Sequence, residues 1–229
     1  MIRMEHIGHS FGDNRVLHDF SLHVHAGEVL TVIGRSGCGK TTMLKMMNGL
    51  LVPDEGRVLV EGTDLAGTDL IALRRRIGYV IQSKGLFPHM TVEKNITYVP
   101  VISGQKDRRK NHALAERMLK LVGLDAEMSS RYPAELSGGQ QQRVGFARAL
   151  ASDPQILLMD EPFGALDEIT RQTMQDEILN LQKKLGLTIV FITHDIREAM
   201  KLGDRILVME QGKILQLDTP ENVRDHPAD

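Results

Sequence analysis

The segment from Gly34 to Thr41 reads "GRSGCGKT" and has the residue types and spacing of a phosphate-binding loop. It matches G-x-x-x-x-G-K-[ST], with a predicted strand before it and a predicted helix after it. Glycine lets backbone N–H groups turn toward phosphate oxygens, and the helix N-terminus adds partial positive charge. The residues expected to contact the nucleotide here are Gly34, Arg35, Ser36, Gly37, Cys38, Gly39, Lys40, Thr41 and Thr42.

The side chains of this loop have separate expected roles. Lys40 would bridge the β- and γ-phosphates, the Thr41 hydroxyl would ligate Mg²⁺, and Thr42 is placed to reach the α-phosphate. Cys38 is interpreted as a spacer within the loop and not as a catalyst. The alternative is an ordinary glycine-rich turn, which the predicted strand–loop–helix context disfavours.

A second motif, "ILLMDEP" from Ile156 to Pro162, places two carboxylates at the end of an apolar strand. In an open α/β sheet, ligands bind at the carboxyl ends of the strands. Asp160 would hold Mg²⁺ through water, and Glu161 would polarise the attacking water. Acidic residues commonly end strands, so this pair alone does not indicate a nucleotide site. Together with the phosphate-binding loop it does.

A third motif, "LSGGQQQRVGFARAL" from Leu136 to Leu150, begins a helical run with glycines and contains no obvious nucleophile or general base. The N–H groups of Ser137, Gly138 and Gly139, together with the Ser137 hydroxyl, would form an anion site at the helix start. A plain helix cap is the alternative interpretation.

The elements that must position these motifs predict an α/β fold in one domain spanning residues 1–229. "FSLHVHAGEVLTVIG" predicts two strands that meet at a turn over residues 26–27, and "KTTMLKMMNGL" predicts a helix ended by Gly49. The apolar runs "QILLMD" and "LTIVFITHD" flank a helix at about residues 170–185, which indicates a parallel sheet covered on both faces. The last residues predict a hairpin across residues 211–212 and a short helix.

Between about residue 91 and residue 152 the helical period dominates, which predicts a helical subdomain inserted into the α/β core. Its clearest stripe has an i, i+4, i+7, i+8 spacing and is followed by Gly123 as the expected C-cap. The residues of the stripe are Leu114, Met118, Leu121 and Val122.

Composition excludes several classes of protein. The 229 residues carry a formal net charge of −2, so the whole chain has no field that would attract nucleic acid. The runs "RRR" and "KDRRK" are interpreted as a solvated helix end and a loop, because no aromatic residues lie among them. The single cysteine excludes an internal disulfide. The longest apolar runs are of strand length, so we expect any membrane-spanning part to belong to another subunit.

The order of the motifs, with "LSGGQ" between the phosphate-binding loop and the "DEP" strand, resembles the ATP-binding subunits of ABC transporters over nearly the whole chain. Gln82 resembles the Q-loop glutamine of that family, "GALD" up to Asp167 resembles its D-loop, and His194 resembles its switch histidine. Phe11 lies where these proteins place an aromatic ring against adenine, and a core position in the β lobe is the alternative.

The resemblance implies a P-loop NTPase core with a mostly parallel sheet, an N-terminal antiparallel β lobe and a helical subdomain. It implies ATP and Mg²⁺ as cofactors, with catalytic roles for Glu161, His194 and Gln82. The implied Mg²⁺ ligands are Thr41, Gln82 and Asp160, and the further nucleotide contacts are Phe11, Ser137, Gly138, Gly139, Gln140 and Asp167.

The resemblance also implies partners. Two copies would pair head to tail, so that ATP bound at Lys40 of one copy is covered by Ser137 and Gly139 of the other. A transmembrane permease would contact the loop after Gln82, a solute-binding protein would act indirectly, and the chain would lie peripherally on the cytoplasmic face of the cell membrane. Non-transport ATPases of the same family, in DNA repair or on the ribosome, are the alternative class.

The resemblance also implies a class of solute. The isoleucine before Gln82 and "EITR" after the D-loop resemble importers of quaternary-amine osmoprotectants such as glycine betaine, choline and carnitine. Against this, Glu168 stands where proline is expected, and importers of other small solutes stay open as an alternative. Related chains often continue into a regulatory domain beyond the position of Asp229.

Overall fold

The computed structural model describes residues 1–81, 85–164 and 166–228. The chain divides into two compact units, of which the first holds residues 1–74 and 182–229 and the second residues 75–181. The predicted helical insertion at about 91–152 lies within the sequence range of the second unit, and its limits stay a prediction.

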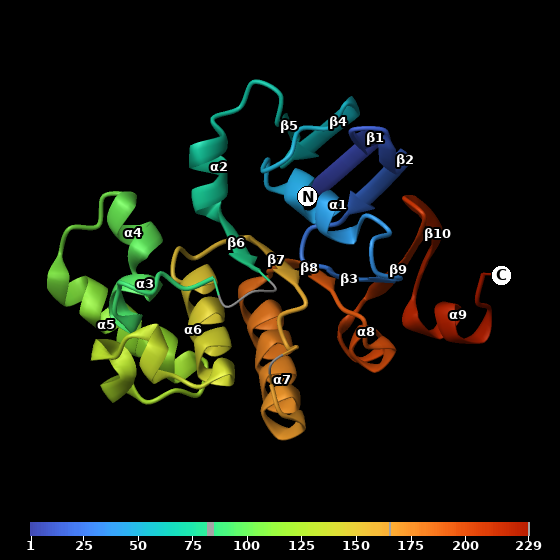
Figure 1. The fold of residues 1–229 in the computed structure, drawn as a ribbon. Helices are drawn as coiled ribbons and strands as arrows, with labels where there is room; N and C mark the ends of the chain where they lie inside the picture. The colour runs from blue at the N-terminus through green and yellow to red at the C-terminus, as the bar shows by residue number, and fades with distance from the viewer. Residues whose placement is uncertain (82–84, 165, 229) are drawn as a thin grey trace. The chain divides into compact units, whose positions relative to one another are not determined.

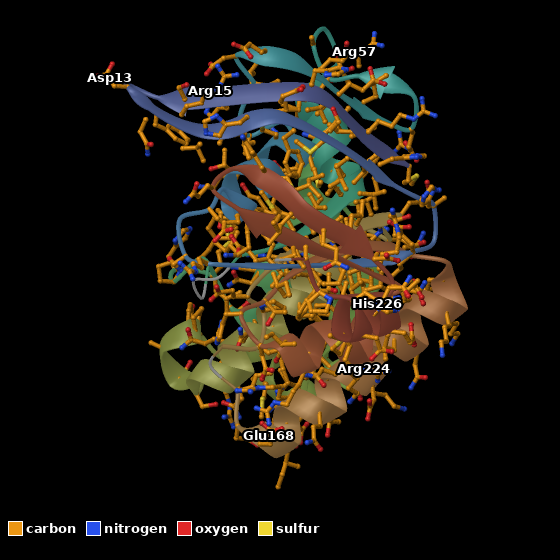
Figure 2. The ribbon with its side chains drawn as sticks, turned by 90° about the vertical axis from the view of Figure 1, so that its right-hand side faces the viewer. Asp13, Arg15, Arg57, Glu168, Arg224 and His226 are labelled. Atoms are coloured by element: carbon orange, nitrogen blue, oxygen red, sulfur yellow. The ribbon has the colours of Figure 1, made fainter. Side chains whose placement is uncertain are left out.

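The first unit contains an antiparallel sheet in the order β2-β1-β4-β5. Its strands are β1 (Ile2–Phe11), β2 (Asn14–Val24), β4 (Glu55–Val60) and β5 (Thr63–Asp64). Figure 1 shows β1, β2 and β4 side by side. Asp13 lies at the turn between β1 and β2, and its side chain points away from the sheet (Figure 2). This sheet confirms the predicted N-terminal antiparallel lobe.

The first unit also contains the strands that carry the phosphate-binding loop, in the order β10-β9-β3-β8. β3 (Val29–Gly34) lies parallel to both β8 (Thr188–Ile192) and β9 (Arg205–Glu210). β10 (Lys213–Asp218) returns antiparallel to β9, which confirms the predicted hairpin. The helices are α1 (Lys40–Met47), α8 (Ile196–Leu202) and α9 (Pro220–Asp225). β3 and β8 are almost wholly buried, which explains their continuous apolar sequence.

The strands on either side of the turn at residues 26–27 do not pair with each other. β2 pairs with β1, whereas β3 pairs with β8 and β9. The turn therefore passes the chain from one sheet to another, although the sequence read locally suggests two strands that meet.

The second unit combines a parallel strand pair with helices. The strands are β6 (Ile77–Val80) and β7 (Ile156–Asp160). The helices are α3 (Val92–Ile96), α4 (Tyr98–Ile102), α5 (Arg108–Leu121), α6 (Gly138–Leu150) and α7 (Glu168–Leu185), of which α7 continues past the unit boundary, and two 3₁₀ turns lie at Ala126–Ser130 and Pro133–Glu135. Just before β6 comes α2 (Leu70–Arg76). A Cβ on Gly78 would lie 2.7 Å from the Ala149 carbonyl oxygen, so the end of α6 passes very close to β6.

The buried stripe of α5 differs in part from the predicted one. Met118 is buried as predicted, but Leu114 and Leu121 are only half-buried, and Ala115 and Leu119 are fully buried in their place. Leu114 faces a cavity described below, which accounts for its exposure. The helix ends at Leu121 with Val122 as C-cap, so Gly123 follows the cap, with a φ of +62°.

Candidate nucleotide site

The loop between β3 and α1 contains glycines in backbone conformations that other residues rarely adopt. The φ angle is +152° at Gly34, +80° at Gly37 and +104° at Gly39. Gly39 is the N-cap of α1, and as a glycine it has no side chain with which to cap this helix. The N-cap residue therefore supplies no acceptor to the first N–H groups of α1, and a helix start of this kind attracts anions.

The β9–β10 hairpin packs against the backbone of this loop. A Cβ on Gly34 would lie 2.2 Å from the carbonyl oxygen of Met209, so only glycine fits. The Gly212 N–H donates to the Cys38 carbonyl at 3.1 Å, and the His18 N–H donates to the Gly212 carbonyl at 3.1 Å. These backbone contacts fix the shape of the loop without any ligand-binding side chain.

Lys40 is buried at the start of α1 and reaches back into the loop. Its Nζ donates to the carbonyl oxygens of Gly34 at 2.7 Å and Arg35 at 2.9 Å, and lies 3.9 Å from Cys38 Sγ. An ammonium group has three N–H donors, and sulfur is a weak acceptor. The ammonium is therefore held inside the loop with one donor still open to a stronger acceptor such as a phosphate oxygen.

The other predicted residues of the loop occupy distinct environments. Arg35, Ser36 and Gly37 are exposed, whereas Cys38 is buried. Thr41 is exposed and Thr42 is half-buried in the first turn of α1. The burial of Cys38 fits a spacer better than a reactive thiol.

His194 follows the end of β8 and is exposed. Because β8 and β3 are neighbouring parallel strands, their carboxyl ends lie at the same edge of the sheet. The structure therefore brings His194 and the phosphate-binding loop to one edge within the first unit. Sequence analysis identified both, but not the contacts that hold His194.

Phe11 ends β1 and is 52% exposed, which excludes the alternative that it is a core residue. Its ring makes an edge-to-face contact with the His9 imidazole, with 4.8 Å between the ring centroids. About half of the side chain is exposed, so the ring has area available for stacking.

The two predicted carboxylates follow each other at the end of β7 in the second unit. Asp160 is buried. The burial of the Tyr79 hydroxyl, together with the negative charge of Asp160, raises the pKa of Tyr79 to about 12. Glu161 has a φ of +47°, a conformation that costs about 1–3 kcal/mol for a residue with a side chain. A strained carboxylate directly after a strand is the kind of feature that marks a functional site.

The donor set fits Mg²⁺. Magnesium is usually held by one or two carboxylates, water and substrate phosphates, and does not need a full protein cage. Among the described residues no group of three or more His, Cys, Asp or Glu could hold a metal. Asp160 and Thr41 each carry an oxygen donor of the kind that Mg²⁺ prefers, and their joint role as ligands stays a prediction.

The third motif begins α6 with a closed capping box. Ser137 Oγ accepts the Gln140 N–H at 3.2 Å, and Gln140 Oε1 accepts the Ser137 N–H at 2.9 Å. Ser137 is exposed, and a Cβ on Gly138 would meet no atom within 4 Å. The N–H groups of Gly138 and Gly139 thus begin a helix that faces open space.

Asp167 has a structural role at the start of α7. Its Oδ1 accepts the Thr170 N–H at 3.0 Å, and this hydrogen bond lowers the pKa of the carboxyl group. Glu168, the first residue of α7, accepts a hydrogen bond from Gln172 at 3.0 Å and is labelled in Figure 2. The nucleotide contact expected of Asp167 stays a prediction.

Gln82, expected as a catalytic residue and Mg²⁺ ligand, lies outside the described residues. The described part of the loop after it is fixed by Asn95, which is fully buried. Asn95 Oδ1 accepts the Phe87 N–H at 2.8 Å, and its Nδ2 donates to the carbonyls of Phe87, Met90 and Thr91. Sequence analysis missed this residue, because a polar side chain inside a helical run carries no signal of its own.

Arg148, in the last turn of α6, also holds this loop. It donates to the Gly85 carbonyl at 2.8 Å and lies 5.6 Å from the centre of the Phe87 ring. Burial lowers its pKa. The helix that begins with Ser137 is therefore joined at its far end to the loop that follows Gln82.

A cavity of about 700 Å³ in the second unit is lined mostly by small apolar, polar and cationic side chains. The cations are Arg75, Arg76, Lys110 and Arg117, and the one carboxylate among the lining residues is Asp153. The runs "RRR" and "KDRRK", interpreted as solvated, thus both contribute to one basic hollow.

Comparison with known proteins identifies the family. A family model described as "ABC transporter" matches residues 17–164. The chain belongs to the ABC transporter family. Within it, the chain is 49% identical over its full length to a carnitine transport ATP-binding protein, OpuCA, of Listeria monocytogenes. It is 48% identical over its full length to a choline transport ATP-binding protein, OpuBA, of Bacillus subtilis.

The chain spans 57% of the Listeria relative and 60% of the Bacillus relative. A solved dimeric ATP-binding cassette of this family, MJ0796 bound to ADP and phosphate, matches with a TM-score of 0.90 and 32% identity, covering 96% of this chain and 99% of that one. This match confirms the predicted ABC ATPase fold. Within residues 1–81, 85–164 and 166–228, no helix is long and apolar enough to span a lipid bilayer.

Proposed function

We propose that this chain is the ATP-hydrolysing subunit of an ABC importer, and that it works as a head-to-tail pair around two ATP molecules. The observation that carries the proposal is the loop before α1, where the N-cap is a glycine that supplies no capping side chain and Lys40 is held inside the loop. An uncapped helix start and a held ammonium together favour a polyphosphate.

Binding of ATP would use groups of the first unit. Backbone N–H groups of the loop would donate to phosphate oxygens, and Lys40 would turn the donor that faces Cys38 Sγ to the γ-phosphate. Phe11 would stack on adenine, in keeping with its exposed ring. His194 would contact the γ-phosphate from the end of β8.

Hydrolysis would use the carboxylates that end β7. Asp160, Thr41 and Gln82 would hold Mg²⁺, which neutralises developing charge on the phosphates when it is bound. Glu161 would accept a hydrogen bond from the attacking water and orient it. The left-handed backbone at Glu161 supports this role, because strain is retained where geometry matters more than stability.

The pair of subunits would complete each site. The N–H groups of Gly138 and Gly139 and the exposed Ser137 would contact the γ-phosphate of ATP bound to the other copy. The open space around Gly138 supports this, as does the dimeric state of the matched cassette. Gln140 would act mainly by keeping Ser137 in place through the capping box.

The permease would contact the loop after Gln82 and also the basic cavity of the second unit. The chain would then lie peripherally on the cytoplasmic face of the membrane, with the solute-binding protein acting only through the permease. The basic cavity supports this, because its four cations would complement acidic side chains of a cytoplasmic permease segment. The exposed Val101 and Ile102 of α4 add apolar area beside it.

The solute would be a quaternary amine of the glycine betaine, choline or carnitine type. The names of the two relatives support this class. Labelled betaine, choline and carnitine should enter cells lacking the gene more slowly, with rescue by the parent gene but not by Glu161→Gln. Unchanged uptake of all three, where no redundant importer exists, would contradict the solute class and leave the ATPase proposal standing.

The ATPase proposal itself is tested with the purified chain. Glu161→Gln should bind ATP with parental affinity but lose turnover by about 100-fold or more, because an amide cannot serve as the water's base. The unhydrolysed pair should then accumulate with Mg-ATP and elute as a dimer on size exclusion. Equal turnover in parent and variant would overturn the assignment.

The docking proposal is tested by charge reversal. Arg117→Glu, on the cavity wall, should reduce co-purification with the permease, whereas Lys120→Glu on the same helix does not face the cavity and should leave it unchanged. ATP hydrolysis by the isolated chain should be the same in both variants. Loss of co-purification in both, or in neither, would contradict the cavity as the docking site.

A further inference from the structure

The backbone on both sides of His194 is fixed by one buried hydroxyl. Thr193 Oγ1 donates to Glu198 Oε2 at 2.5 Å and accepts the Asp195 N–H at 3.0 Å. Thr193 and Glu198 are buried, whereas His194 between these contacts is exposed. The hydroxyl thus uses both its donor and its acceptor capacity to close a turn around His194.

The same turn is tied to the strand that carries the phosphate-binding loop. The Thr193 N–H donates to the Val32 carbonyl on β3 at 3.1 Å, which extends the β3–β8 ladder by one residue. Val32 lies two residues before Gly34, where the loop begins. The position of His194 relative to the loop is therefore set by Thr193 on one side and by α8 on the other.

Glu198 departs from the usual helix-start arrangement. It is the third residue of α8, where Glu commonly accepts the N–H of the N-cap residue in a capping box. Here the N-cap is Asp195, and its N–H goes to Thr193 Oγ1, while Glu198 accepts from that same hydroxyl. The Thr193 hydroxyl thus lies between the Asp195 N–H and the Glu198 carboxylate. Glu198 therefore contacts residue 193, two positions before the N-cap.

Burying a carboxylate is costly unless it is hydrogen-bonded, and stability alone would favour an apolar residue at this position. α8 is already capped by Asp195, which accepts the Arg197 N–H at 2.8 Å. The contact between Glu198 and Thr193 therefore contributes an orientation that the cap does not: it fixes the peptide groups before and after His194.

We infer that Glu198 is a positioning residue that acts through the Thr193 hydroxyl to hold His194 toward the γ-phosphate. This inference rests on the proposed function, in which His194 contacts that phosphate. A displacement of about 1 Å in such a group can cost on the order of 100-fold in rate, without loss of binding energy elsewhere.

The chain offers a matched control on the same strand. Thr188, at the other end of β8, is as buried as Thr193, and its Oγ1 accepts the Gly27 N–H at 2.9 Å. Thr193→Val and Glu198→Ala should lower kcat about 10-fold to 100-fold with the Kd for ATP within about 2-fold of the parent. Thr188→Val should lose comparable thermal stability but keep kcat, and Thr193→Ser, which restores the hydroxyl, should recover most of the rate.

A readout independent of turnover is the NMR spectrum of the full chain. The imidazole C–H signals of His194, assigned by their loss in His194→Ala, should shift in Thr193→Val and Glu198→Ala but not in Thr188→Val. Unshifted signals together with parental kcat would overturn the inference while leaving the proposed function intact. If the parent does not hydrolyse ATP, or if His194→Ala does so at the parental rate, the proposed role of His194 and this inference both fail. Equal loss of kcat in Thr193→Val and Thr188→Val would mean that the Thr193–Glu198 contact has only a structural role, and the inference would fail.

Discussion

Helices α1 and α6 both begin at glycine-rich sequence, yet they differ in whether a side chain of the N-cap residue binds their first N–H groups. α1 has the glycine Gly39 as N-cap, in a left-handed conformation, so its N-cap residue supplies no capping side chain. α6 has Ser137 as N-cap, and Gln140 completes a reciprocal capping box. The N-cap of the first helix offers no side-chain acceptor to the N–H groups that follow it, whereas in the second helix one N–H is already bound by the N-cap serine.

The glycines of the two starts also have different surroundings. Gly34 lies against the Met209 carbonyl with no room for a Cβ, whereas Gly138 has open space around the position of its Cβ. Gly34 is thus required by the fold itself, and Gly138 is not. This difference indicates a rigid cradle in one case and a surface left clear for another molecule in the other.

The largest expected effect tests this difference in packing. Gly34→Ala should destabilise the chain by more than about 3 kcal/mol, because the new Cβ clashes with backbone that cannot move away. Gly138→Ala should change the free energy of unfolding by no more than about 1 kcal/mol, in either direction. Urea unfolding of both variants measures the difference, and similar losses would contradict the contrast between the two glycines.

The next effect separates binding from closure of the pair. Lys40→Ala should weaken ATP binding by roughly 100-fold, because a charge-assisted contact worth about 3 kcal/mol is lost. Ser137→Arg should leave ATP binding to the single subunit unchanged and abolish the ATP-dependent dimer, since a bulky cation would enter the partner's site. Calorimetric titration and size exclusion measure the two properties. Weakened ATP binding in Ser137→Arg would mean that both helix starts act within one subunit.

A smaller effect concerns the cap itself. Ser137→Ala should cost about 1 kcal/mol of stability, because the Gln140 N–H loses its acceptor. Ser137→Thr keeps a hydroxyl and should recover most of that stability. Thermal unfolding of the three chains provides the measurement. The N-cap of α1 is a glycine, so no matching substitution exists there. An unchanged melting temperature in Ser137→Ala would show that the capping box does not contribute to stability.

The smallest effect concerns α7, whose start is capped by a carboxylate. The pKa of Asp167 is lowered in the folded chain by its bond to Thr170, so its contribution is present above the unfolded pKa. That contribution should be lost as the pH falls through the lower folded pKa, below about pH 4. Asp167→Asn should flatten this part of the stability–pH curve, and a curve identical to that of the parent would contradict the cap.

Local sequence was enough to predict most elements and motifs, because apolar runs and glycine positions depend on neighbouring residues alone. The turn at residues 26–27 was predicted, but sequence could not show that β2 and β3 enter different sheets, because strand pairing depends on distant residues. The stripe on α5 was partly misplaced, because the apolar spacing does not show that Leu114 faces a cavity.

For the site, the sequence identified residues by type but not their supports. Glu198 lies only four residues after His194, yet its contact with Thr193 depends on how α8 turns back over the strand end. Asn95 and Arg148 reach the loop after Gln82 from different helices, a relation that no local spacing contains. The capping box of α6 had a sequence signal, since Ser137 and Gln140 have the required spacing.

The strands that flank β3 have a consequence for the order in which the protein is made. β3 and the phosphate-binding loop leave the ribosome early, but their neighbours β8 and β9, and the Gly212 that holds Cys38, are translated near the other end of the sequence. When a nascent chain has been translated only as far as β7, both partners of β3 are still missing. The apolar strand β3 therefore stays unpaired until β8 and β9 have been made. The ability to hold a nucleotide is then acquired late and all at once, when the β9–β10 hairpin has been added.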